Sequence, residues 1–137
     1  MKQDKITVST EVHAPIEKIW HAYTSPEHVK EWNFASDDWC CPDASCDLRE
    51  GGKFSFRMEA KDGSIGFNFE GTYTKIVMNE RIEYDFGDRH AVVEFTPQDG
   101  TVIIRVSFDP EAEHPIEQQR DGWQAILDNF ARHVAAA

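Results

Sequence analysis

The sequence contains few basic residues, and it has no long hydrophobic run. Its 137 residues include 14 lysine and arginine residues against 25 aspartate and glutamate residues, a formal net charge of −11. Nucleic acid and anionic membrane surfaces repel such a charge, so neither is expected as a partner. No apolar run approaches the ~18 residues of a membrane helix, and the N-terminus lacks an apolar signal segment. These absences predict a cytoplasmic protein without membrane insertion.

Cysteine is also scarce, with Cys40, Cys41 and Cys46 as its three occurrences. An odd number of cysteines without an export signal does not indicate a disulfide framework, so reduced thiols are expected. Neighbouring aspartates could add ligands for a metal site, but the paired Cys-x2-Cys spacing and downstream histidines of zinc sites are absent. Loop or half-buried thiols are the favoured interpretation, and no metal or cofactor is predicted.

Alternating apolar and polar residues predict a series of strands. Residues 6–12 alternate with period two, as in a strand with one buried face. The same period recurs in five later stretches, at residues 54–58, 67–74, 82–86, 91–95 and 102–108. Short turns separate these later stretches, which implies that neighbouring strands are antiparallel.

Helical spacing occurs in three segments. Two short helices are expected over residues 15–23 and 26–32, each beginning near a proline. A long final helix is expected from about residue 116 to residue 135, where it would span roughly 30 Å. Between residues 33 and 45 the periodicity disappears, so this segment is predicted to be a loop that carries aromatic side chains.

These elements predict an α+β fold of helix-grip type. A curved antiparallel sheet of six to seven strands wraps around the long C-terminal helix, and two short helices follow the first strand. The length fits one domain over residues 1–137. The inward face of the sheet is rich in aromatic residues, interrupted only by the hydroxyls of Tyr73 and Tyr84. Between this face and the helix lies a wedge, which either side chains or a ligand must fill.

The acidic residues of the strands fall in the outward phase, so paired-carboxylate catalysis is not supported and no catalytic residue is predicted. The acids concerned are Glu59, Glu70, Glu83, Asp85 and Glu94. The six histidines show neither metalloprotease nor catalytic-triad spacing. Among the six histidines, His90 is distinguished by its position, because it begins a strand and is expected near the rim of the wedge.

Five segments carry a resemblance to a known family: APIEKIWHAY (14–23), SPEHVKEW (25–32), EGGKFSFRM (50–58), FEGTY (69–73) and DGWxxxLxxF (121–130). In their order and spacing they resemble the START-like helix-grip (SRPBCC) superfamily, and within it the branch homologous to activators of the heat-shock-protein ATPase. The resemblance implies a cavity between helix and sheet, which in some relatives receives lipids, sterols or polyketides. Other relatives are polyketide cyclases or co-chaperone domains.

The favoured function is non-catalytic binding of a hydrophobic small molecule, lipid-like or polyketide-like, because the inward face has no group that ionises near neutral pH. Two alternatives stay open: a co-chaperone-like module that binds a chaperone or another protein, and a cyclase-like or hydrolase-like enzyme. The oligomeric state is also open. The predicted ligand contacts are Trp32, Phe34, Trp39, Phe56, Met58, Phe67, Phe69, Tyr73, Tyr84, Phe86, His90, Phe95, Trp123 and Leu127.

Overall fold

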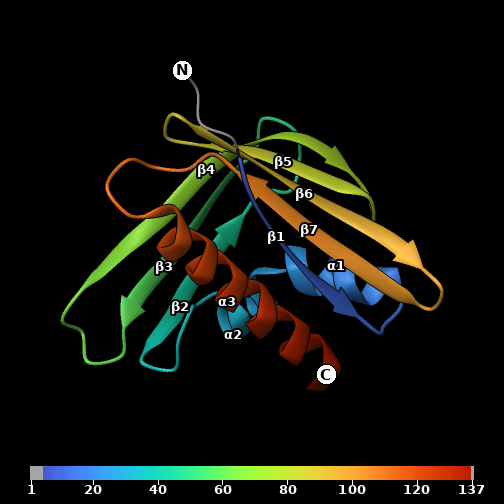
Figure 1. The fold of residues 1–137 in the computed structure, drawn as a ribbon, viewed down its shortest axis with the longest axis horizontal. Helices are drawn as coiled ribbons and strands as arrows, with labels where there is room; N and C mark the ends of the chain where they lie inside the picture. Colours follow the sequence, from blue (N-terminus) through green and yellow to red (C-terminus); the bar gives the residue numbers. More distant parts are fainter. Residues whose placement is uncertain (1–4, 137) are drawn as a thin grey trace.

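The structure, a computed structural model, describes residues 5–136 as one curved sheet and three helices (Figure 1). The elements in chain order are β1 (Ile6–Val12), α1 (Ile16–Thr24), α2 (Pro26–Trp32), β2 (Trp39–Cys46), β3 (Lys53–Ala60), β4 (Gly66–Val77), β5 (Arg81–Phe86), β6 (Arg89–Gln98), β7 (Thr101–Phe108) and α3 (Ile116–Ala136). This arrangement confirms the α+β helix-grip fold predicted from the sequence. No helix within residues 5–136 is long and apolar enough to cross a membrane.

The seven strands form a single antiparallel sheet in the order β1-β7-β6-β5-β4-β3-β2. Although β1 and β2 follow each other along the chain, they form the two opposite edges of this sheet. The chain between them must therefore cross the open side of the curve, and α1 and α2 make that crossing. In Figure 1 the sheet curls around α3, with α1 and α2 near the C-terminal end of α3.

The hairpin between β6 and β7 is tighter than the sequence pattern predicts. Asp99 and Gly100 both have positive φ angles, of 49° and 84°. Two consecutive left-handed residues suit the two-residue turn of a hairpin with the usual strand twist. Strand β6 therefore continues through Pro97, beyond the stretch 91–95 that the alternation predicts. Since β5 pairs with β6 only as far as Glu94, the missing amide hydrogen of Pro97 removes no bond to β5.

The prediction of a loop over residues 33–45 is wrong in its second part, because residues 39–46 form β2. This strand pairs with β3, but the register shifts between Cys40 and Asp43. Such a bulge breaks the period-two pattern on which the sequence-based prediction depends. Pro42 lies within the shift, and it is tolerated because β2 is an edge strand.

The C-terminal half of α3 is packed tightly against the short helices. Phe130 is fully buried, and its ring centroid lies 5.2 Å from that of Tyr23 and 4.9 Å from that of Trp32. The Trp32 indole Nε1 donates a 3.0 Å hydrogen bond to the carbonyl oxygen of Ala22, which fixes α2 against α1. This end of the wedge is therefore a solid aromatic core.

Candidate ligand-binding cavity

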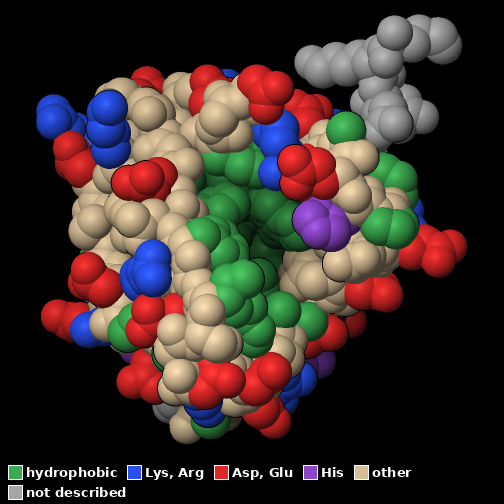
Figure 2. Space-filling model, turned by 90° about the vertical axis from the view of Figure 1, so that its left-hand side faces the viewer, with side chains coloured by type: hydrophobic (Ala, Val, Ile, Leu, Met, Phe, Trp, Pro, Cys, Tyr) green, Lys and Arg blue, Asp and Glu red, His purple; other side chains and the backbone are tan. Residues whose placement is uncertain are grey.

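A cavity of about 680 Å³ lies between the concave face of the sheet and α3. Figure 2 shows it as a deep hollow with hydrophobic side chains inside and charged side chains around its mouth. Its aromatic and aliphatic walls come from Tyr23, Val29, Trp32, Trp39, Phe54, Phe56, Met58, Phe67, Phe69, Tyr73, Ile82, Tyr84, Val106, Trp123, Ile126 and Leu127. The volume falls within the range of roughly 300–1,000 Å³ that is usual for small-molecule sites.

Helix α3 leaves this space open because of two residues in its cavity-facing stripe. Gly122 has no side chain, and a Cβ atom placed there would meet nothing within 4 Å. Its neighbour Trp123 stacks on Phe108 of β7, with ring centroids 3.9 Å apart and an interplanar angle of 11°. The stacked indole holds the helix at a fixed distance from the sheet, so the gap at Gly122 stays open.

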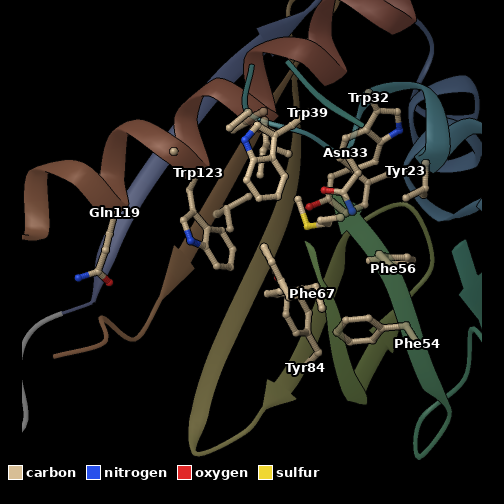
Figure 3. Close-up of a pocket in the computed structure, with 18 of the residues that line it drawn as sticks. Tyr23, Trp32, Asn33, Trp39, Phe54, Phe56, Phe67, Tyr84, Gln119 and Trp123 are labelled. Carbon is tan, nitrogen blue, oxygen red and sulfur yellow. The ribbon is translucent and has the colours of Figure 1, made fainter. Parts of the chain in front are cut away.

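Ten of the fourteen predicted contact residues line the cavity: Trp32, Trp39, Phe56, Met58, Phe67, Phe69, Tyr73, Tyr84, Trp123 and Leu127. Figure 3 shows several of them converging from β3, β5, α3 and the segments around α2. Phe67 is 47% exposed and has its ring centroid 6.1 Å from that of Trp39. These two rings therefore lie where the cavity opens to solvent.

Three of the other predicted aromatic residues lie outside the lining. Phe95 is buried in the packed end, where its ring contacts Trp20 and Tyr23. Phe86 is buried beneath Trp123, with 5.8 Å between the ring centroids. Phe34 is half-buried, and its backbone carbonyl accepts a 2.6 Å hydrogen bond from the side chain of Asn129. All three strengthen the walls or ends of the cavity without facing into it.

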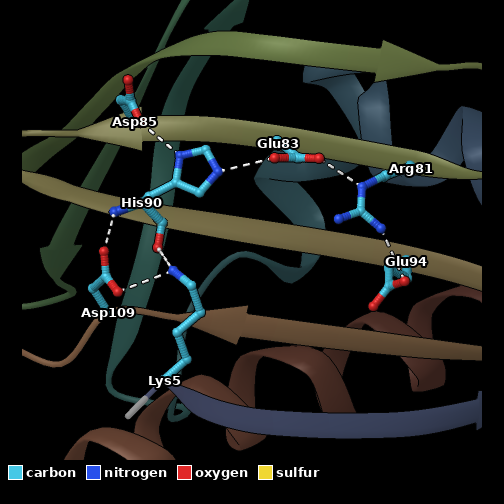
Figure 4. Close-up of polar contacts among 7 residues, drawn as sticks. All are labelled: Lys5, Arg81, Glu83, Asp85, His90, Glu94 and Asp109. Atoms are coloured by element: carbon cyan, nitrogen blue, oxygen red, sulfur yellow. Dashed lines mark hydrogen bonds and ion pairs between the residues drawn. The ribbon is translucent and has the colours of Figure 1, made fainter. Parts of the chain in front are cut away.

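His90 does not lie at the cavity rim, and that prediction is wrong. It pairs across strands with Asp85, which places both side chains in the outward phase of the sheet. There its Nδ1 lies 2.6 Å from Asp85 Oδ1, and its Nε2 lies 3.1 Å from Glu83 Oε1. Figure 4 shows that His90 belongs to a polar network that also includes Arg81. The side-chain alternation of β6 therefore separates His90 from the cavity.

The networks around His90 and His133 give the two side chains opposite pKa shifts. Partial burial lowers the pKa of His90, but hydrogen bonds to Asp85 and Glu83 outweigh burial and the nearby Lys5, so the pKa is raised above 6.5. In contrast, burial lowers the pKa of His133, which lies 2.9 Å from His28 between Nε2 and Nδ1. The charge of His28 also lowers the pKa of His133.

These shifts predict a maximum in the free energy of unfolding near pH 6.5. The contribution of His90 is present below the unfolded pKa of 6.5 and is lost as the pH rises through its higher folded pKa. The cost of protonating His133 appears as the pH falls from 6.5 through its lower folded pKa. Urea unfolding between pH 5 and pH 8 measures both, because this range lies below the ionisation of the Cys41 and Cys46 thiols, whose pKa values burial also raises. His90→Gln should remove the alkaline decline and His133→Gln the acidic decline, whereas unchanged profiles in both variants would contradict the assignment.

The cavity has more polar groups than the two tyrosines predicted from the sequence. Tyr23, Asn33 and Arg89 also line it. Burial raises the pKa of Tyr23, Tyr73 and Tyr84 above that of an ordinary tyrosine, so all three hydroxyls are neutral at neutral pH. They can orient a ligand by hydrogen bonding, and they are not suited to act as bases.

Asn33, directly after α2, was missed because it falls where the helical pattern ends. It is only 8% exposed, and its side-chain amide forms no hydrogen bond with any residue between 5 and 136. Its backbone amide donates to the carbonyl of Val29 at 3.0 Å, which closes the end of α2. The Asn33 side chain is therefore a donor and acceptor available to a ligand in an otherwise apolar wall.

Gln119 shapes the mouth of the cavity rather than its interior. Its Oε1 accepts a 2.8 Å hydrogen bond from the Glu111 amide, and its Nε2 donates to the carbonyl oxygens of Glu111 and His114 at 3.1 and 2.8 Å. Figure 3 shows the Gln119 amide directed away from the cluster of aromatic rings. The side chain ties the segment between β7 and α3 to the first turns of α3. A glutamine within an apolar helical stripe was the available sequence signal.

The residues that could hold a metal do not form a buried centre. Within residues 5–136, the only cluster of at least three histidine, cysteine or acidic ligands is Glu111, Glu113 and His114 at the cavity mouth. Glu113 and His114 are exposed, and the cluster has no other feature that points to an ion. The cysteines are free thiols within β2, and burial raises the pKa of Cys41 to about 11, so its thiol is protonated.

A curved antiparallel sheet that grips a long C-terminal helix around an apolar cavity defines a START-like helix-grip protein. The sequence profile of the family described as "Activator of Hsp90 ATPase homolog 1-like protein" matches residues 13–135, and the chain belongs to this family. A comparison with curated proteins found no match.

Solved structures similar to this chain support the same assignment. The solution structure of the AHSA1-like protein from Aeromonas hydrophila is 40% identical, with a TM-score of 0.87, over 95% of this chain and 92% of that one. Chr148 from Cytophaga hutchinsonii is 44% identical, with a TM-score of 0.84, over 98% and 94% of the two chains. Protein NE0264 from Nitrosomonas europaea is 18% identical over 97% and 95%, with a TM-score of 0.83, and shares the fold.

Proposed function

We propose that this protein binds a hydrophobic small molecule, lipid-like or polyketide-like, in the cavity between the sheet and α3, without transforming it chemically. The observation that carries the proposal is the aromatic-lined space of about 680 Å³. Removing apolar ligand surface from water would contribute about 25 cal/mol per Å² before the costs of association. The neutral tyrosine hydroxyls and the Asn33 amide would fix the orientation of the ligand.

The gap at Gly122 provides the test. Gly122→Phe places a ring in open space on the cavity-facing stripe of α3, so we expect the affinity for a bound molecule to fall by about tenfold or more, at least 1.4 kcal/mol. The neutral probe N-phenyl-1-naphthylamine reports this affinity through energy transfer from the tryptophans that line the cavity. Gly122→Ala should keep the affinity and raise the free energy of unfolding by about 0.5–1 kcal/mol, because glycine disfavours a helix interior.

Arg120→Phe is the matched control, because it adds the same ring to an exposed position of α3 outside the cavity. We expect this variant to bind the probe as the unmodified protein does. If no probe binds the unmodified protein, or if both phenylalanine variants weaken binding equally, the proposed function is wrong.

The alternative function is a co-chaperone-like module that stimulates a heat-shock-protein ATPase. The family description and the net charge of −11 support it, since an acidic surface would attract a basic face on a partner. This alternative predicts faster ATP hydrolysis by an Hsp90-type chaperone when the protein is added, and a smaller effect at high salt. The effect should be the same with Gly122→Phe, which distinguishes a surface interaction from a function of the cavity.

A further inference from the structure

We infer that the ligand of the cavity is an amphipathic acid, whose carboxylate is held by Arg89 and whose apolar body lies among the aromatic side chains. This inference rests on the proposed function, because it assigns the chemical class of the molecule bound there. It starts from the position of a single cation in the cavity lining.

Arg89 is held rigidly on the concave face of the sheet. It pairs with Phe86 across the hairpin between β5 and β6, and its guanidinium carbon lies 4.5 Å from the Phe86 ring centroid. Its Nε donates a 2.9 Å hydrogen bond to the backbone carbonyl of Asp109. These two contacts orient the guanidinium plane, so little side-chain freedom would be lost when a ligand binds.

The outer two nitrogens of Arg89 have no partner among residues 5–136, and Arg89 forms no ion pair within that range. Other arginines of the chain do form such pairs: Arg49 with Asp47, Arg57 with Glu59, and Arg81 with Glu83 and Glu94.

The other arginines without an ion pair in residues 5–136 are all exposed, whereas Arg89 is half-buried in the lining of the cavity. Glu111, which also lines the cavity, is already bonded through Oε1 to His114 Nδ1 at 2.5 Å. The paired nitrogens of arginine match the two oxygens of a carboxylate. A ligand carboxylate would therefore supply the counter-charge that the protein does not.

A second donor lies on the same wall of the cavity. Tyr84 is buried, and its ring centroid lies 5.6 Å from that of Phe86, over which the Arg89 guanidinium is placed. Its hydroxyl forms no hydrogen bond within residues 5–136, and it remains protonated at neutral pH because burial raises its pKa. A neutral hydroxyl can donate to a carboxylate that Arg89 already binds.

Away from Arg89 the wall of the cavity is mostly apolar. Phe56 and Met58 on β3 and Trp39 on β2 belong to strands at the far edge of the sheet from β6. A molecule with its acid group at Arg89 would direct its apolar body toward these side chains. A medium-chain fatty acid has both parts.

The test compares decanoate with 1-decanol, two ligands that share a chain length and differ in charge. Each displaces N-phenyl-1-naphthylamine from the cavity at pH 7.5. We expect decanoate to bind about tenfold or more tightly than 1-decanol, as charge-assisted hydrogen bonds predict, and to lose this advantage in Arg89→Gln. The affinity for 1-decanol should be unchanged in that variant. Arg105→Gln, which removes an exposed arginine from β7 outside the cavity, should leave both affinities unchanged.

The outcomes separate this inference from the proposed function. If the probe and 1-decanol bind but decanoate has no advantage in the unmodified protein, the ligand class is wrong and the cavity function stands. The same conclusion follows if Arg89→Gln weakens both ligands equally. If neither the probe nor any ligand binds, the proposed function itself fails. The comparison in the unmodified protein needs no variant, so it remains decisive even if Arg89→Gln does not fold.

Discussion

Replacing Phe130 with alanine is expected to lower the free energy of unfolding by about 3–5 kcal/mol. The side chain is fully buried in the C-terminal half of α3, and its ring packs edge-on against Tyr23 and Trp32. Those neighbours are large, rigid rings that cannot move in to fill the space, so most of the cavity left by the substitution should persist. Urea unfolding followed by tryptophan fluorescence measures the loss.

Two further variants identify the cause of this loss. Phe130→Leu keeps a large apolar side chain, and its loss should be clearly smaller than that of Phe130→Ala. Arg120→Ala, at an exposed position of the same helix, should change stability by no more than about 0.5 kcal/mol. A loss below about 1 kcal/mol in Phe130→Ala would mean that this half of α3 does not anchor the helix.

Gly71→Ala is expected to destabilise the protein by about 1–3 kcal/mol and also to weaken ligand binding. Gly71 lies in β4 opposite Phe54, and a Cβ atom there would lie 2.4 Å from the carbonyl oxygen of Asp85 and 2.6 Å from Phe54 Cζ. Because the carbonyl belongs to a neighbouring strand, it cannot easily withdraw. The Phe54 ring would therefore be pushed toward the cavity that it lines.

A double-mutant cycle separates the two clashes. If displacement of the ring contributes to the loss, Gly71→Ala combined with Phe54→Ala should cost less than the sum of the single substitutions. Gly122→Ala serves as the control glycine, because a Cβ atom at that position meets no neighbour. Additive losses, with binding unchanged in Gly71→Ala, would refute a role for Gly71 in making room for the ring.

The elements that the sequence predicted well are those whose pattern is set locally. The strands from β3 to β7 alternate apart from Val92 and Ile103, and the stripe of α3 follows helical spacing, so most of the aromatic wall could be predicted from the sequence. Strand β2 was missed because its bulge interrupts the alternation. The direction of His90 was misjudged because the position of a residue near a strand end does not reveal which face it occupies until the pairing with Asp85 is known.

Local sequence patterns did not identify the polar groups that line the cavity, for a different reason. Arg89 follows a turn at Gly87 and Asp88, where an arginine normally extends into solvent. Its pairing with Phe86 places it on the concave face of the sheet, and its hydrogen bond to the Asp109 carbonyl holds it beside the cavity. Asn33 likewise gains its position from how α2 meets β2 and α3, which depends on tertiary packing.

The two halves of α3 differ in what their side chains contact. Phe130 and Val134 secure the helix to the remainder of the core, whereas Gly122 and Ile126 face the open space. Substitutions at Gly122 and Ile126 can therefore reshape the cavity while Phe130 and Val134 keep the helix attached. The same scaffold can accommodate ligands of different size through changes at a few positions, and engineering of new specificity should begin at Gly122.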